Sequence, residues 1–123
     1  GVPTLVVSWD DLDTDEGNAL AEQAMGGHGD EMETSINLYL QPELVNMELA
    51  VQDYGNRSPR DYGGYQPGRL TRDETDPNYT ATGIFGDATL ATPEKGKRAL
   101  EILTEEWLKA LEGFAEVPLR RGN

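Results

Sequence analysis

The stretch "GGHGDEMETSINLYLQPELV", residues 26–45, contains the only histidine of the sequence, His28, between glycines and a cluster of acids. The flanking glycines leave the imidazole sterically open, and Glu31 and Glu33 can bring negative charge close enough to favour its protonated form. An open imidazole of this kind suits a proton carrier near neutral pH. A surface or structural histidine without a chemical role is the alternative.

A helix is predicted within this stretch, from Asp30 or Glu31 to Leu40, because Pro42 interrupts the pattern. Glu33 falls in its first or second turn. Acids at this position stabilise a helix through its dipole, so Glu31 and Glu33 are explained either as helix-stabilising residues or as members of a site. One side of the helix would carry Met32, Ile36, Tyr39 and Leu40.

The opening of the chain, "VPTLVVSW", predicts a β-strand at Thr4–Ser8 that is buried on both faces, because its apolar residues are continuous. Such a strand needs parallel neighbours, yet the other plausible strand segments, around 44–51 and 82–85, are short and weak. We therefore expect the sheet to continue in another polypeptide. Trp9, at the carboxyl end of the strand, can either wall a substrate pocket or pack against the sheet edge.

Two further helices are predicted on either side of the chain's middle section. One runs from Thr14 to about Met25 and stops at Gly26. The other begins after Thr92, a capping residue, and ends at Gly113. It carries an apolar stripe that indicates core packing, formed by Leu100, Leu103, Trp107, Leu111 and Phe114.

A long irregular segment is predicted at residues 52–82, which are rich in Gly, Pro, Asp and Tyr and lack an apolar period. Its tyrosines make it more aromatic than a plain linker. The segment therefore either packs over a site or a subunit boundary, or is disordered.

The composition limits the class of protein. The chain has 123 residues, the length of one domain, with 10 basic and 23 acidic residues and a formal net charge of −13. We expect neither nucleic acid nor membrane as a partner; the acids form a solvated surface or include metal ligands. An apolar run of about 18 residues and a signal-peptide pattern are both absent. Cysteine is absent too, and we expect a cytoplasmic protein.

Three blocks of the sequence, in the same order, resemble the creatininase (creatinine amidohydrolase) family. The block "HGDEMETSINLYLQPELV" is similar to its His-x-Gly-x-x-Glu-Thr-Ser signature, the following helix and a Pro-x-Leu-Val ending. The block "TGIFGDATLATPEKGKRALEILTEEWLKAL" is similar to its Gly-x-x-Gly-Asp-Pro-x-x-Ala-Thr-x-Glu-Lys-Gly segment and terminal helix. The block "LVVSWDDL" resembles the strand before the signature.

The resemblance implies an α/β fold, in which residues 1–123 form the C-terminal half of one creatininase-like domain, with layered helices around a mostly parallel sheet. It implies an enzyme, a metal-dependent amidohydrolase that uses a pair of divalent ions (Zn, Mn or Fe). The substrate would be a small molecule with a non-peptide C–N amide or cyclic amide bond. In that family the signature histidine is a proton carrier and the glutamate before Thr-Ser binds metal. These roles fall on His28 and Glu33, and Trp9 is the candidate for substrate binding.

The sequence departs from the family pattern in three places. Asp30 replaces a small residue, Ala88 stands where Pro is common, and no tryptophan lies just before His28. Creatinine itself is therefore a poor candidate for the substrate.

The metal ligands of the family's N-terminal half are a Glu-x-His pair, an aspartate and a His-Gly-Gly-Asn or His-Tyr-Glu-Asn motif; neither the pair nor either motif occurs in this sequence. One imidazole plus carboxylates would give at best a weak site for a hard cation. We therefore expect Gly1 to lie at a break in the fold, with a partner polypeptide or a cleaved first half completing the site. The resemblance also implies that the assembled unit would form a homo-oligomer such as a hexamer. The alternative is a non-catalytic acidic scaffold or regulatory subunit that retains the creatininase-like fold.

Overall fold

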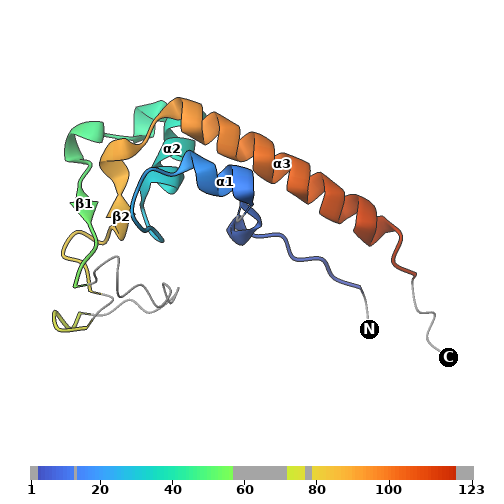
Figure 1. Ribbon diagram of the computed structural model, residues 1–123, viewed down its shortest axis with the longest axis horizontal. Helices are drawn as coiled ribbons and strands as arrows, with labels where there is room; N and C mark the ends of the chain where they lie inside the picture. The colour runs from blue at the N-terminus through green and yellow to red at the C-terminus, as the bar shows by residue number, and fades with distance from the viewer. Residues whose placement is uncertain (1–2, 13, 57–71, 77–78, 119–123) are drawn as a thin grey trace.

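A long C-terminal helix organises the structure. The computed structural model describes residues 3–12, 14–56, 72–76 and 79–118. In it α3, Pro93–Ala115, is a 23-residue helix against which α1, Asp15–Leu20, and α2, Glu31–Leu40, pack (Figure 1). None of the helices in these ranges is long and apolar enough to cross a membrane.

Short elements connect and flank the helices. In the described ranges, 3-10 turns lie at η1, Trp9–Leu12, η2, Pro42–Leu44, η3, Met47–Leu49, and η5, Ala88–Leu90. Strand β1, Gln52–Asp53, pairs antiparallel with β2, Gly86–Asp87, so that Gln52 lies opposite Asp87. This small sheet lies beyond the N-terminal end of α3 (Figure 1).

The core lies between α2 and α3. Its buried members are Leu12, Met32, Ile36, Ala99, Ile102 and Leu103. The two helices cross closely at Gly96 and Ser35, because a Cβ atom at Gly96 would lie only 2.0 Å from the carbonyl oxygen of Ser35. A side chain at this position would separate the helices.

The helix predictions are confirmed in their type and in most of their limits. Helix α2 begins after Asp30, and α3 begins after Thr92, whose side chain accepts a hydrogen bond from the Lys95 N–H. Helix α1 is shorter than predicted and ends at Leu20, because Ala21 is extended and the N–H groups of Glu22 and Gln23 donate to the Glu31 carboxylate rather than to helix carbonyls. Gly113 does not end α3, which continues to Ala115.

The strand prediction at Thr4–Ser8 is wrong for this structure. Residues 3–8 belong to no strand, and Val6 is 81% exposed rather than buried on both faces. A strand requires a neighbouring strand for its backbone hydrogen bonds, and in the described residues the two strands pair with each other. The described part of the chain is therefore rich in helix, and the predicted layered, mostly parallel sheet is not confirmed.

The segment 52–82, predicted to be irregular, begins with β1. Hydrogen bonds join its first residues to residues nearer its end. Thr82 donates from its hydroxyl to the Asp53 carboxylate at 2.7 Å. The Asn56 amide donates to the carbonyl of Glu74 at 2.7 Å. Residues 57–71 and 77–78 lie outside the described residues, so the choice between a packed and a disordered loop stays open there.

Candidate active site

The main chain of His28 is anchored while its side chain is exposed. The His28 N–H donates to the carbonyl of Phe85 at 3.2 Å, and the Phe85 N–H donates to the carbonyl of His28 at 2.7 Å. Gly29 follows with φ of +57°, a conformation that glycine adopts readily. Within the described residues, no hydrogen bond or ion pair involves the imidazole. The hydrogen bonds to Phe85 therefore fix the main chain from which the imidazole projects.

Glu33 lies in the first turn of α2, and its side chain faces back toward Gly29. Its Oε2 accepts a hydrogen bond from the N–H of Gly29 at 2.7 Å. The hydroxyl of Thr34 donates to the carbonyl of Gly29 at 3.2 Å. Two side chains of the signature thus bind the residue that follows His28, and His28 and the Glu33 carboxylate lie at the same end of α2.

Asp30 is the capping residue of α2. Its Oδ1 accepts hydrogen bonds from the N–H groups of Met32 and Glu33, both at 3.0 Å. Its Oδ2 accepts a third hydrogen bond from the side-chain nitrogen of Gln23 at 2.9 Å. A capping carboxylate satisfies N–H groups that have no partner within the helix. This capping role explains why an aspartate stands at position 30, where the family pattern has a small residue.

Glu31 is fully buried, and both of its carboxylate oxygens have partners. Oε2 accepts from the N–H groups of Glu22 and Gln23, both at 2.8 Å. Oε1 pairs with the ammonium of Lys95, which also binds Glu22 at 2.6 Å. Burial alone would lower the pKa of Lys95, but the hydrogen bonds and charges of the two glutamates raise it above its ordinary value. The charge of Glu31 is thus paired with Lys95 rather than with His28.

Asp87 holds the second sequence block in place. Its Oδ1 accepts from the N–H and the hydroxyl of Thr89, and its Oδ2 accepts from the Gln52 amide at 2.6 Å. Burial alone would raise the pKa of this carboxyl, but these hydrogen bonds lower it below its ordinary value of 3.8. Asp87 is therefore a structural anion that links β1, β2 and η5.

The two sequence blocks that resemble the family meet in space. The Ser35 hydroxyl, from the first block, donates to the carbonyl of Glu31 at 2.6 Å and accepts from the N–H of Thr92, in the second block, at 3.0 Å. Lys95 and Gly96 of the second block contact Glu31 and Ser35 of the first. The start of α3 therefore supports the start of α2, where His28 and Glu33 lie.

Sequence reasoning missed several residues that shape this site. The capping role of Asp30 could have been found from the N-cap preference for aspartate. Gln23 carries no local signal, and Lys95 lies in the second family-like block but its partner could not be predicted, because Asp87 and Glu31, which they bind, lie elsewhere in the chain. Trp9 begins η1, but its side chain lies outside the described part, so its predicted substrate contact is untested.

The described residues do not by themselves fit a metal centre. Nowhere among them do three or more His, Cys, Asp or Glu side chains gather in a way that could hold an ion. Glu31 is neutralised by Lys95, while Asp30 and Asp87 accept hydrogen bonds from helix and turn N–H groups. We therefore assign no catalytic step to a metal held by these residues alone.

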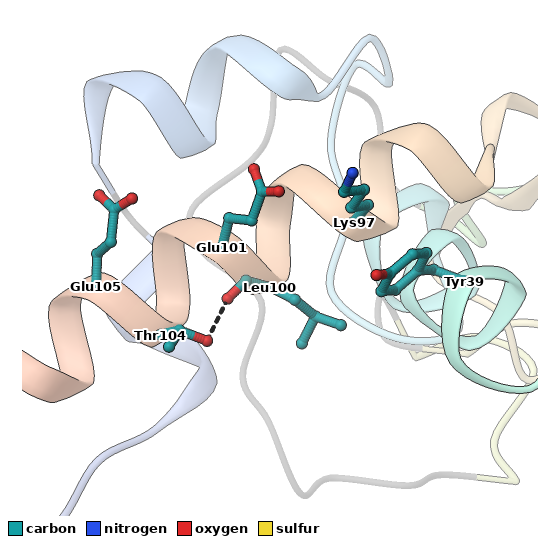
Figure 2. A pocket seen from close by; sticks show the side chains of 6 residues that line it. All are labelled: Tyr39, Lys97, Leu100, Glu101, Thr104 and Glu105. Atoms are coloured by element: carbon teal, nitrogen blue, oxygen red, sulfur yellow. Dashed lines mark hydrogen bonds between the residues drawn. The ribbon is translucent and has the colours of Figure 1, made fainter.

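A separate hollow of about 320 Å³ lies at the opposite end of α2 from His28. Figure 2 shows Tyr39 of α2 beside side chains of α3, with the Thr104 hydroxyl donating to the carbonyl of Leu100 at 2.7 Å. Its remaining lining residues are Lys97, Glu101 and Glu105. His28 and Glu33 do not line this hollow, so it is not part of the candidate active site.

Comparison with protein families shows a match over most of the chain. Residues 2–111 match the family described as Creatininase: Creatinine amidohydrolase. The match includes both sequence blocks that the fold brings together. No curated protein and no solved structure matches the chain.

Proposed function

The chain belongs to the creatininase family, and from this premise we propose that it forms part of a metal-dependent enzyme that hydrolyses a non-peptide C–N amide or cyclic amide bond of a small molecule. Family membership implies hydrolase activity of the amidohydrolase type, and members generally use a divalent metal. The observation that carries the proposal is the exposed His28 on an anchored main chain, next to the Glu33 turn.

In this proposal His28 carries the proton. Hydrolysis adds a water oxygen to the amide carbon, breaks the C–N bond and requires a proton on the departing nitrogen. An imidazole can take the proton from the attacking water and deliver it to that nitrogen. The bridge to Phe85 keeps the His28 backbone in place while its side chain stays accessible to substrate.

Glu33 is proposed as one metal ligand from this chain. Its carboxylate is half-buried and accepts one hydrogen bond, through Oε2, from Gly29. The sequence contains a single imidazole, so we propose that the remaining ligands come from a polypeptide carrying the other half of the fold. The assembled unit would act in the cytoplasm as a homo-oligomer.

The substitution His28→Gln tests this function in the assembled protein. We expect turnover of an amide substrate to fall about a hundredfold or more, the scale of a lost general acid or base. Metal content and oligomeric state should stay unchanged. Full activity of the variant across the pH range would contradict the proton-carrier role. An assembled native protein without metal and without amidase activity would instead favour the non-catalytic scaffold.

A further inference from the structure

Gln23, in the turn between α1 and α2, joins three segments through one side chain. Its amide oxygen accepts from the N–H groups of Asp87 at 3.0 Å and Glu31 at 3.2 Å. Its amide nitrogen donates to the Asp30 carboxylate at 2.9 Å. The amide orientation suits its neighbours, because its oxygen faces two donors and its nitrogen faces an anion. Gln23 therefore connects its own turn to the start of α2 and to β2.

These attachment points lie on both sides of the His28 bridge. Asp30 follows His28 by two residues, and Asp87 follows Phe85, the bridge partner of His28, by two residues. The side chain of Gln23 thus sets the spacing between the start of α2 and β2. The main chain of His28 lies between these two attachments.

Two glycines close tightly around the Gln23–Asp30 pair. A Cβ atom at Gly26 would lie 2.1 Å from the side-chain nitrogen of Gln23 and 2.3 Å from Oδ2 of Asp30. A Cβ atom at Gly86 would lie 2.5 Å from the Cβ of Asp30 and 2.7 Å from the amide oxygen of Gln23. A residue with a Cβ atom at either position would displace the Gln23–Asp30 pair, so both positions depend on glycine.

We propose that Gln23 is a positioning residue that holds His28 where it exchanges protons with the substrate. The inference rests on the proposed function of His28. Gln23 binds the backbone or side chains of Glu31, Asp30 and Asp87, and the main chain from which the His28 imidazole projects lies between these attachments. A displacement of about 1 Å in a reacting group costs about a hundredfold in rate. A variant in which residue 23 holds Asp30 less firmly should therefore lower the rate about tenfold.

The first test is Gln23→Glu in the assembled protein. The new side chain has the same shape and keeps an oxygen for the two N–H groups, but it cannot donate to Asp30 and places a second negative charge beside it. We expect kcat to fall about tenfold with KM within about twofold, since placement rather than binding is affected. The imidazole signals of His28, observed by NMR with this chain labelled at its single histidine, should shift or broaden.

A rescue variant makes the test specific. In the double variant Gln23→Glu/Asp30→Asn, the amide introduced at position 30 donates to the new carboxylate, and its oxygen still caps Met32 and Glu33. We expect this variant to recover most of kcat and the native His28 signals. A failure of rescue, with the double variant folded, would overturn the inference.

Two controls separate positioning from general effects. Gln41→Glu makes the same chemical change at an exposed residue at the end of α2, and Trp107→Phe removes the hydrogen bond from the indole to Asp11. Both should keep native kcat and native His28 signals. A Gln23→Glu variant that behaves like these controls would overturn the inference. If the His28 signals change in Gln23→Glu while kcat does not, Gln23 does position His28, but His28 is not the proton carrier.

Discussion

The ammonium of Lys95 in α3 binds the fully buried carboxylate of Glu31 at the start of α2, although 64 residues separate the two in sequence. The same carboxylate accepts two backbone N–H bonds from the turn that contains Gln23. One anion therefore joins α2, α3 and the turn before His28. A buried charge is costly unless it is paired and hydrogen-bonded, so the arrangement depends on Lys95.

The substitution Lys95→Met should lower the free energy of unfolding by about 3 kcal/mol, because it leaves the Glu31 carboxylate buried without a cation. Urea denaturation measures this change. Lys109→Met is the matched control, since the pair of Lys109 with Glu106 is on the surface and should contribute little. Adding Glu31→Gln to Lys95→Met should recover part of the loss. Equal stability of the Lys95 and Lys109 variants would contradict this role of the buried pair.

Gly96→Ala should destabilise the protein by about 2 kcal/mol, because the new methyl group would overlap the Ser35 carbonyl and push α2 from α3. Gly113→Ala provides the control in the same helix. A Cβ atom there would have no neighbour within 4 Å. Alanine is also more favourable than glycine within a helix, by about 0.5–1 kcal/mol. Thermal unfolding of both variants should give shifts of opposite sign. A Gly96 variant as stable as the native protein would show that the helix crossing is not close.

Glu33→Gln should reduce the metal content of the assembled protein, because an amide is a poorer ligand than a carboxylate for a hard divalent ion. Elemental analysis after dialysis measures the effect. Glu31→Gln is the comparison, because Glu31 is committed to Lys95 and should leave the metal content unchanged. Unchanged stoichiometry in the Glu33 variant would remove it from the ligands and favour its role as an acid in the first turn of α2.

Asp87 should contribute to the acid sensitivity of the fold. Its folded pKa lies below the ordinary value of 3.8, so its contribution to stability is present above that value and is lost as the pH falls through the folded pKa. Asp87→Asn should therefore be less stable than the native protein at about pH 7, and this difference should narrow at about pH 2–3. Urea midpoints at both pH values measure it. A difference independent of pH would contradict the assignment.

The sequence predicted α2 and the start of α3 well, because their limits depend on neighbouring residues. Asp30 caps α2, and the helix ends at Leu40, just before Pro42. Thr92 caps α3, and Pro93 occupies its first position. The exposed setting of His28 also follows from its flanking glycines. In each case, the signal and its effect lie within a few residues of one another.

The strand prediction at Thr4–Ser8 failed for the opposite reason. Apolar β-branched residues favour a strand only where another strand offers hydrogen bonds and a surface to cover them. In the described residues the two strands pair with each other instead, and Val6 is largely exposed. Local composition carries no information about whether a partner strand is present.

The sequence by itself determined where α2 and α3 begin, where α2 ends and the membership of the family, since these follow from short-range patterns and from three blocks of motif residues. Only the tertiary structure decided that Glu31 pairs with Lys95 rather than with His28, and that Gln23 clamps the start of α2 to β2. A carboxylate or an amide can accept many partners, and its choice depends on which groups the folded backbone brings within about 3 Å. Those distances exist only after segments far apart in the chain have packed together.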